Sequence, residues 1–227
     1  MPEARPVQGG TLYVVATPIG NLEDITLRAA RILGQVDRVL AEDTRRTRRL
    51  LTHLGHATAT VSLHQHNERG RIPQVLGWLL EGQSLALVSD AGTPGISDPG
   101  FPLIRAVLDA ELRVIPVPGA SALVAAASAA GLPTDRLYFL GFLPGRPGRR
   151  KRALQEALST PSTVVLYVGP HKLPRILKTL VELAGPERSA CVCRELTKIH
   201  EEFDRAPLGE LAERWGSKKV RGEVTLL

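Results

Sequence analysis

The feature that most constrains this chain is the regular alternation, in its first half, of short apolar runs with segments of helical periodicity. In the first repeat, apolar and β-branched residues run over 12–16, and Asn21 then opens a segment whose apolar positions recur at helical spacing. The same order repeats with apolar runs at 39–41, 60–63, 85–89 and 114–115 and helical patterns at 44–54, 72–80 and after residue 99. Continuous apolar strands separated by helices predict a mostly parallel sheet that is covered on both faces.

A cluster at Pro116, Pro118 and Gly119 interrupts this pattern and marks the expected domain boundary. We predict a flexible N-terminus over residues 1–10, an N-terminal α/β domain over 11–116 and a C-terminal α/β domain over 117–227. In the second domain we expect strands at 138–141, 163–168, 190–193 and 224–227, a basic loop near 146–152, and helices at 120–130, 172–183 and 208–215. These strands alternate less regularly with helices, so a mixed sheet is expected there.

The distribution of apolar residues and cysteines limits the cellular context. No apolar stretch approaches the roughly 18–20 residues that a membrane-spanning helix needs, and residues 1–10 lack the apolar core of a secretory signal. The expected location is the cytoplasm, with no membrane partner. Cys191 and Cys193 are separated by one residue on an expected strand and should project from the same face. Packing as reduced thiols is favoured over a redox or metal role, because no second ligand cluster accompanies them.

Positive charge is in excess, with 29 Lys and Arg against 23 Asp and Glu and a net charge of +6. Basic side chains gather at Arg45, Arg46, Arg48 and Arg49 and again over residues 146–152. The excess favours an anionic partner, and the alternative is a solvated basic surface. Aromatic residues make up only 4% of the chain, too few for a platform that stacks single-stranded bases. Folded RNA recognised by its shape and phosphates therefore fits the composition, and no DNA partner is expected.

Two loops that follow expected strands are rich in residues that shape the backbone. Thr17-Pro18-Ile19-Gly20-Asn21 holds one glycine and does not match the three-glycine dinucleotide fingerprint. The run from Ser89 to Gly100 holds three glycines, two prolines and two aspartates. Its place at the carboxyl end of a parallel strand favours a ligand-binding role over a plain turn.

Three polar clusters also follow expected strands, at residues 42–45, 64–68 and 194–198. A Glu-Asp pair such as that of the first cluster more often caps the helix that follows, and Asp43 is well suited to do so. His64 and His66 in the second lack a third ligand at a metal-binding spacing, so no metal is predicted. The motifs of serine hydrolases, P-loop nucleotidases and zinc proteases are absent from the sequence.

Taken together, these segments resemble a known family, the tetrapyrrole methylase-like methyltransferases. The matching stretches run in order along nearly the whole chain, at 12–22, 41–45, 64–68, 89–100, 118–122, 141–144, 194–198 and 222–223. The resemblance implies two α/β domains with an active-site cleft between them that binds S-adenosylmethionine (SAM), and it implies a homodimer. The sequence is similar to the branch of the family that methylates the ribose 2′-hydroxyl of a cytidine in 16S ribosomal RNA, near the decoding centre of the small ribosomal subunit.

The resemblance also implies which residues lie at the cofactor. Gly92-Thr93-Pro94 falls on the Gly-Asp-Pro motif of the family, with Thr93 in place of the acid as in the ribosomal RNA branch. The residues expected at SAM are Pro18, Ile19, Gly20, Ser89, Asp90, Gly92, Thr93, Pro94, Ile96, Ser121, Ala122, Tyr167 and Val168.

Two features depart from the family pattern. Tyr167 is followed by Val168-Gly169-Pro170-His171, where relatives commonly show Glu-Ser-Pro-His, so any role of that Glu and Ser is not carried over. The sequence also ends at Leu227, where relatives add a small helical region after the last strand.

Methyl transfer to a ribose hydroxyl requires alignment of nucleophile and donor, and it benefits from a base that takes the hydroxyl proton. The candidate catalytic residues are the polar side chains of the three clusters, namely Glu42, Asp43, His66, Glu68, Glu195 and Lys198. The candidates for contact with RNA are Arg45, Arg46, Arg146, Arg149, Arg150, Lys151, Arg152 and Arg194. For Arg45 and Arg194 the alternative is an ion pair with a nearby carboxylate.

Three other functions are compatible with parts of this pattern. They are a C-methyltransferase of the tetrapyrrole pathway, a protein methylase of the diphthamide pathway, and a ribosome-assembly factor that binds RNA without catalysis. Thr93 and the segment Ala41–Arg45 favour the ribosomal RNA branch over the first two.

Overall fold

A computed structural model describes residues 6–227, and the chain divides after Ser121 into two units, each with its own five-stranded sheet. The flexible N-terminus expected over residues 1–10 falls in part on residues 1–5, which lie outside the described residues. Pro116, taken from the sequence as part of a break, belongs to an edge strand instead. An edge strand tolerates proline because one side of it has no partner that needs the missing N–H. Across residues 6–227, no helix is both long enough and apolar enough to cross a membrane.

The sheet of the first unit is entirely parallel, as the alternation of apolar runs and helices predicts. Its strands are β1 (Thr11–Val15), β2 (Arg38–Ala41), β3 (Ala59–Ser62), β4 (Leu85–Val88) and β5 (Arg113–Val117). They lie in the order β3-β2-β4-β1-β5, so β1 has β4 on one side and β5 on the other. Because the strands are parallel, they all end at one edge of the sheet, which we call the carboxyl edge.

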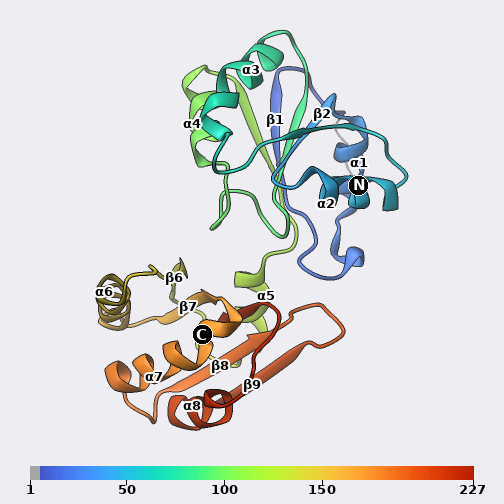
Figure 1. Ribbon diagram of the computed structural model, residues 1–227. Helices are drawn as coiled ribbons and strands as arrows, with labels where there is room; N and C mark the ends of the chain where they lie inside the picture. The colour runs from blue at the N-terminus through green and yellow to red at the C-terminus, as the bar shows by residue number, and fades with distance from the viewer. Residues whose placement is uncertain (1–5) are drawn as a thin grey trace. The chain divides into compact units, whose positions relative to one another are not determined.

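Helices cover both faces of this sheet (Figure 1). Successive residues of β1 point to opposite faces, so Tyr13 and Val15 join one apolar cluster and Leu12 joins the other. The first cluster includes side chains of α1 (Leu27–Gln35) and α2 (Thr44–His53). The second includes side chains of α3 (Glu68–Leu80) and α4 (Phe101–Asp109). The sheet is therefore buried on both faces, which explains why its strands are continuous apolar runs.

Two helices start at positions that differ from the prediction. The helix expected from Asn21 is a short 3-10 turn, η1 (Leu22–Asp24), followed by α1. The hydroxyl of Thr26 caps α1, which places its start after that residue. Helix α3 starts at Glu68 rather than at residue 72, because the turn before it already bonds the Glu68 N–H to the carbonyl of His64. A side-chain cap decides the start of α1 and a backbone turn bond that of α3, rather than apolar periodicity.

The second unit holds a mixed sheet, which confirms the prediction for this half of the chain. Its strands are β6 (Leu137–Phe142), β7 (Thr163–Val168), β8 (Ser189–Arg194), β9 (Glu202–Pro207) and β10 (Val224–Leu226). In the order β6-β7-β10-β8-β9, only the pair β6 and β7 is parallel. The sequence does not predict β9, because its polar composition is that of an edge strand rather than of an apolar run.

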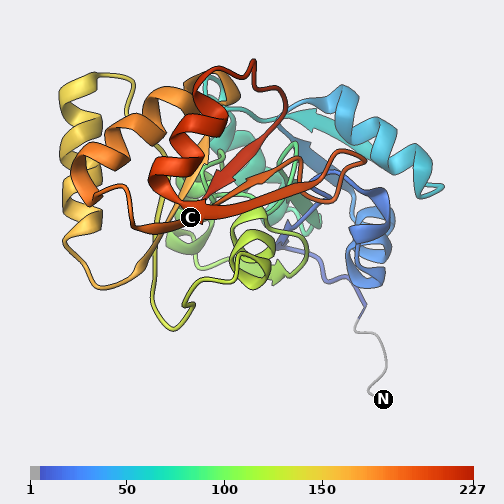
Figure 2. The ribbon, with the colours of Figure 1, turned by 90° about the horizontal axis from the view of Figure 1, so that it is seen from below.

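Helices α6 (Pro147–Leu158), α7 (Leu173–Ala184) and α8 (Leu208–Gly216) share one apolar cluster with this sheet, and α7 lies between the other two (Figure 2). Val192 of β8 points into that cluster. Cys191 and Cys193 flank Val192, so both face the other side of the sheet, where they are fully buried. Their sulfur atoms lie 3.6 Å apart without a disulfide, which confirms the predicted packing of two reduced cysteines.

The basic loop predicted near residues 146–152 is wrong, because this segment forms the first turns of α6. Pro147 stands at the start of the helix, where the fixed φ of proline suits helical backbone. Leu154, one turn after the basic residues, is fully buried in the apolar cluster of the unit. Arg150 is turned inward as well, with 7% exposure and a hydrogen bond from Nη1 to the carbonyl of Gly145 at 3.3 Å.

Candidate functional site

The loop after β1 and the loop after β4 are joined by backbone hydrogen bonds at the carboxyl edge. The N–H of Thr17 donates to the carbonyl of Gly92 at 2.9 Å, and the N–H of Gly92 donates to the carbonyl of Thr17 at 3.0 Å. The hydroxyl of Thr17, which is buried, donates to the carbonyl of Ser89 at 3.2 Å. The two loops therefore hold each other in place.

The loop after β5 is tied to the same position. Oγ1 of Thr93 donates to the carbonyl of Ala120 at 3.3 Å. A Cβ added at Gly119 would lie 3.0 Å from the Cβ of Ala16, so the chain passes close to the end of β1. Helices α1 and α4, which follow β1 and β4, cover opposite faces of the sheet. Ligands of open parallel sheets bind at the carboxyl ends of strands whose connections separate in this way.

Glycines give the loop after β4 a backbone that a ligand can approach closely. Gly92 and Gly95 have φ angles of +84° and +81°, a conformation that residues with a Cβ rarely adopt. Ile96, at 43% exposure, adds apolar surface beside this bare backbone. The three joined loops contain the expected cofactor residues of the first unit, which are Pro18, Ile19, Gly20, Ser89, Asp90, Gly92, Thr93, Pro94, Ile96 and Ser121.

The three other expected cofactor residues belong to the second unit. The hydroxyl of Tyr167 accepts a hydrogen bond from the N–H of Leu123 at 3.1 Å, in the first turn of α5 (Ala122–Ala129). The ring of Tyr167 also packs edge-on against Phe139, with centroids 5.0 Å apart. Val168 is buried, so its side chain belongs to the core, and Ala122 is the first residue of α5. Tyr167 thus connects β7 with α5, a contact that its place in the sequence does not reveal.

Two acidic residues follow β2 at the carboxyl edge, and their environments differ. Asp43 caps α2, where the guanidinium and the backbone N–H of Arg45 donate to its carboxylate and lower the pKa of Asp43 to about 2. Burial raises the pKa of Glu42, and the negative charge of Asp90 raises it further. Asp90 is fixed nearby because its Oδ1 accepts the N–H of Asp43 at 2.9 Å. Of the two acids, Glu42 is therefore the stronger base.

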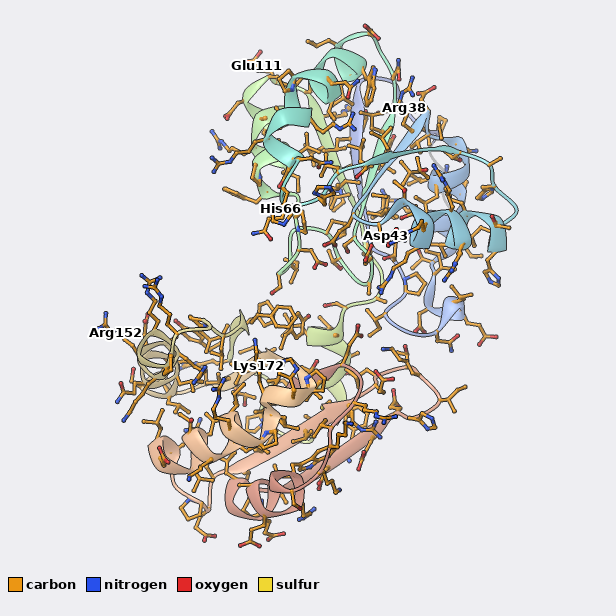
Figure 3. The ribbon with its side chains drawn as sticks, viewed as in Figure 1. Arg38, Asp43, His66, Glu111, Arg152 and Lys172 are labelled. Carbon is orange, nitrogen blue, oxygen red and sulfur yellow. The ribbon has the colours of Figure 1, made fainter. Side chains whose placement is uncertain are left out.

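The histidines of the cluster after β3 lie at the same end of the unit. Figure 3 shows Asp43 and His66 at the end of the first unit where the strands finish, and Arg38 and Glu111 at its opposite end. His66 is exposed, and its backbone N–H donates to Nδ1 of His64 at 3.2 Å. This bond fixes the turn that leads into α3.

Glu68, the acid of that cluster, has a structural partner. Its side chain is 4% exposed, and Oε1 accepts the N–H of Leu103 at 3.3 Å. Leu103 belongs to the first turn of α4, so the carboxylate binds a free N–H group of that helix start. Among residues 6–227, no group of three or more His, Cys, Asp or Glu side chains is placed to hold a metal ion.

The cluster after β8 closes a strained turn in the second unit. Glu195 has a φ of +52°, and its carboxylate accepts hydrogen bonds from Nζ of Lys198 at 2.8 Å and from the N–H of Glu223 at 2.9 Å. A Cβ added at Gly222 would lie 2.4 Å from that carboxylate, which explains why glycine precedes Glu223. The two catalytic candidates of this cluster, Glu195 and Lys198, thus bind each other.

Several arginines expected at RNA are engaged within the protein. Arg45 pairs with Asp43, and Arg194 pairs with Glu202 at 3.0 Å, which is the alternative considered for both. Arg150 is buried rather than presented on the surface, because its guanidinium turns inward and donates to the carbonyl of Gly145, in the loop before α6. The exposed residues of the expected set are Arg45, which is paired with Asp43, and Arg46, Arg146, Arg149, Lys151 and Arg152, the last of which is labelled in Figure 3.

The chain is similar over nearly its whole length to several bacterial proteins named ribosomal RNA small subunit methyltransferase I. The protein of Halalkalibacterium halodurans is 46% identical over 218 residues, which cover 96% of this chain and 75% of that protein. The protein of Escherichia coli O157:H7 is 45% identical over 220 residues, which cover 96% of this chain and 77% of that protein.

Solved structures with a similar fold include methyltransferases. The methyltransferase CobJ aligns with a TM-score of 0.71 at 19% identity, over 96% of this chain and 93% of that chain. Uroporphyrin-III C-methyltransferase from Thermus thermophilus, in complex with S-adenosylhomocysteine, aligns with a TM-score of 0.68 at 20% identity, over 95% and 96% of the two chains. The family model described as Tetrapyrrole (Corrin/Porphyrin) Methylases matches residues 11–212. The chain therefore belongs to the tetrapyrrole (corrin/porphyrin) methylase family and is a methyltransferase.

Proposed function

We propose that this protein transfers a methyl group from SAM to the ribose 2′-hydroxyl of a cytidine in 16S ribosomal RNA, near the decoding centre of the small ribosomal subunit. The observation that carries the proposal is the similarity, at 45% to 46% identity over 96% of the chain, to proteins named ribosomal RNA small subunit methyltransferase I. The choice of cytidine and of the ribose oxygen rests on the family resemblance of the motifs.

The three joined loops at the carboxyl edge of the first unit fit SAM. The bare backbone at Gly92 and Gly95 accommodates close approach of the ligand, and the partly exposed Ile96 suits the apolar face of an adenine ring. SAM, when bound, supplies a methyl group on a positively charged sulfur. A relative that shares the fold has been crystallised with S-adenosylhomocysteine, the product that remains after methyl transfer.

We assign the role of proton acceptor to Glu42. A ribose hydroxyl must lose its proton as it attacks, and a base with a pKa closer to the working pH takes that proton more readily. Asp43 has a pKa of about 2 and is a weak base, and Glu68 is held at the start of α4. Glu42 lies at the carboxyl edge, and its pKa is raised by burial and by Asp90.

The role of Glu42 is tested with Glu42→Gln, which keeps the shape of the side chain and removes the base. Methyl transfer should fall by about 10²–10⁴-fold while binding of SAM and RNA is retained. In the wild-type protein, the acid limb of the pH-rate profile should be shifted upward from the pKa of an ordinary glutamate, because the pKa of Glu42 is raised. A Glu42→Gln variant with wild-type activity would exclude this role.

The reaction is tested with methyl-labelled SAM and four acceptors: assembled 30S subunits, naked 16S ribosomal RNA, free cytidine and a tetrapyrrole precursor. We expect label in 30S subunits, located on a cytidine ribose by mass spectrometry of ribonuclease fragments. A deoxycytidine at the target position should remain unmethylated, because it lacks the 2′-hydroxyl. Label on a base, equal label in free cytidine, or label in the tetrapyrrole alone would each refute the assigned acceptor.

A homodimer and a cytoplasmic location, both expected from the sequence, stay predictions. Two-fold pairing is the most frequent form of association for soluble enzymes. Sedimentation at micromolar concentration should show a species of twice the chain mass, and a species near 24.5 kDa alone would contradict the dimer.

A further inference from the structure

A small pocket opens at the carboxyl edge of the first unit, and the loops proposed to bind SAM form part of its wall through Pro18, Ser89 and Asp90. Its walls come from the loop after β1, the end of β4 and one face of α2, and its volume is about 190 Å³. Pockets that enclose whole small ligands measure roughly 300–1,000 Å³. This pocket is therefore suited to one part of a larger ligand. It is lined by Thr17, Pro18, Leu22, Arg46, Thr47, Arg49, Leu50, Ser89 and Asp90.

The arginines of α2 divide into two pairs by their contacts. Arg45 is bound in two places to the carboxylate of Asp43, and Arg48 donates from Nε to Oγ1 of Thr60 at 3.0 Å. Arg46 and Arg49 line the pocket instead, three residues apart and hence on one face of the helix. Helix α2 therefore presents two arginines to the pocket and turns the other two to protein partners.

The two pocket arginines are weakly held by the protein. Arg46 has one ionic contact, 3.5 Å from Nη1 to Oδ2 of Asp90, and its side chain is 63% exposed. Arg49 is exposed and, within the part of the chain that the structure describes, makes no ion pair. Asp90 also accepts the N–H of Asp43, so this carboxylate keeps a hydrogen bond when Arg46 turns to another anion. The pocket thus carries two positive charges against one negative charge.

The uncharged part of the lining is mainly apolar, with Pro18, Leu22 and Leu50. A free inorganic anion gains nothing from such a surface, whereas the carbon atoms of a ribose pack against it. A phosphodiester with its attached ribose combines the two chemistries in one group, and arginine binds phosphate oxygens through paired N–H donors.

We propose that this pocket binds a phosphodiester of the RNA substrate together with its ribose, next to the target nucleotide, and that Arg46 and Arg49 contact the phosphate. The inference rests on the proposed function, because it takes RNA as the substrate. Arg49, which belongs to the same basic cluster in the sequence, joins Arg46 in the RNA-binding set, and Arg45 leaves that set because Asp43 holds it.

The test compares Arg46→Gln/Arg49→Gln with a control that removes the same charge, Arg48→Gln/Arg105→Gln. Arg48 and Arg105 are exposed, and each already has a protein partner, Thr60 and Asp109. Binding of naked 16S ribosomal RNA is measured by filter retention over a range of salt concentrations, and SAM binding is measured by calorimetry on the same preparations.

In the Arg46→Gln/Arg49→Gln variant we expect RNA affinity to fall about ten-fold or more, since a charged hydrogen-bonded contact is lost. The slope of log affinity against log salt should become shallower by about one, as expected for one phosphate contact, and SAM affinity should stay unchanged. The control should bind RNA within about three-fold of wild type.

Equal losses in the two variants would assign the effect to general charge and overturn the proposal, as would an unchanged Arg46→Gln/Arg49→Gln variant. Binding of cytidine 5′-monophosphate as tight as that of RNA would assign the pocket to free nucleotides instead. Methyl incorporation into 30S subunits by the wild-type protein tests the proposed function separately from the role of the pocket. Without incorporation the proposed function fails, whereas incorporation with unchanged RNA binding by the variant refutes the pocket alone.

Discussion

Replacement of Glu68 separates a structural role from a catalytic role for this acid, which the sequence presents as a catalytic candidate. Its buried carboxylate accepts the N–H of Leu103 in the first turn of α4. Gly100, at the N-cap position of α4, has no side chain to take that place. Glu68→Ala would leave a buried N–H without a partner, which costs about 1–3 kcal/mol, and it would remove a charged hydrogen bond of about 1.5–3 kcal/mol.

These two costs overlap, because they describe one contact, so we expect Glu68→Ala to lower the free energy of unfolding by about 3 kcal/mol. Glu68→Gln keeps an oxygen acceptor and loses only the charge, so about 1 kcal/mol is expected for it. For a unit of this size, each kcal/mol shifts Tm by roughly 3–5 °C, which gives a decrease of roughly 10 °C for the alanine variant.

Thermal unfolding followed by circular dichroism measures the decrease, with Glu81→Ala as a control at an exposed glutamate that ends the same helix, α3. Methyl transfer into 30S subunits is measured well below the transition, where Glu68→Gln should keep activity within about three-fold of wild type. A catalytic acid or base would lose about 10²–10⁴-fold instead. Unchanged Tm together with lost activity in Glu68→Gln would refute the structural assignment.

Three further predictions concern other parts of the chain. Arg45 lowers the pKa of Asp43 in the folded state from 3.8 to about 2. The contact of the ionised Asp43 carboxylate with Arg45 therefore stabilises the folded state above pH 3.8, and this stabilisation is lost as the pH falls toward 2. Urea unfolding of Asp43→Asn should therefore show a flatter dependence on pH over that window. Gly222 has a φ of +85°, and a Cβ added there would lie 2.4 Å from the carboxyl of Glu195. Gly222→Ala should therefore lower the free energy of unfolding of the second unit by about 1–3 kcal/mol. Gly216→Ala, which meets no atom within 4 Å, should not. The hydrogen bond between the two thiols lowers the pKa of Cys191 and raises that of Cys193, but both side chains are fully buried, so native protein should react with a thiol reagent only after unfolding.

The amino-acid sequence by itself determines the parallel sheet of the first unit and the mixed sheet of the second. Apolar runs such as 85–88 are buried on both faces, and a strand buried in this way needs an apolar side chain at every position. The candidate cofactor loops are also visible in sequence, because glycine is needed where φ is positive, as at Gly92 and Gly95. Polar residues give a weaker signal: β9 and the start of α6 are missed, since an edge strand and a basic helix face share the composition of loops.

Only the tertiary structure decides which polar side chains remain free to act. Glu68 and Glu195 are alike in sequence as acids near strand ends, yet each is held by a backbone N–H from a distant segment, that of Leu103 for Glu68 and that of Glu223 for Glu195. The same holds for α2, where contacts with Asp43 and Thr60 engage two arginines and leave Arg46 and Arg49 at a pocket. The physical reason is that hydrogen-bond partners and burial depend on residues distant in the chain, and these set the pKa and the availability of each group.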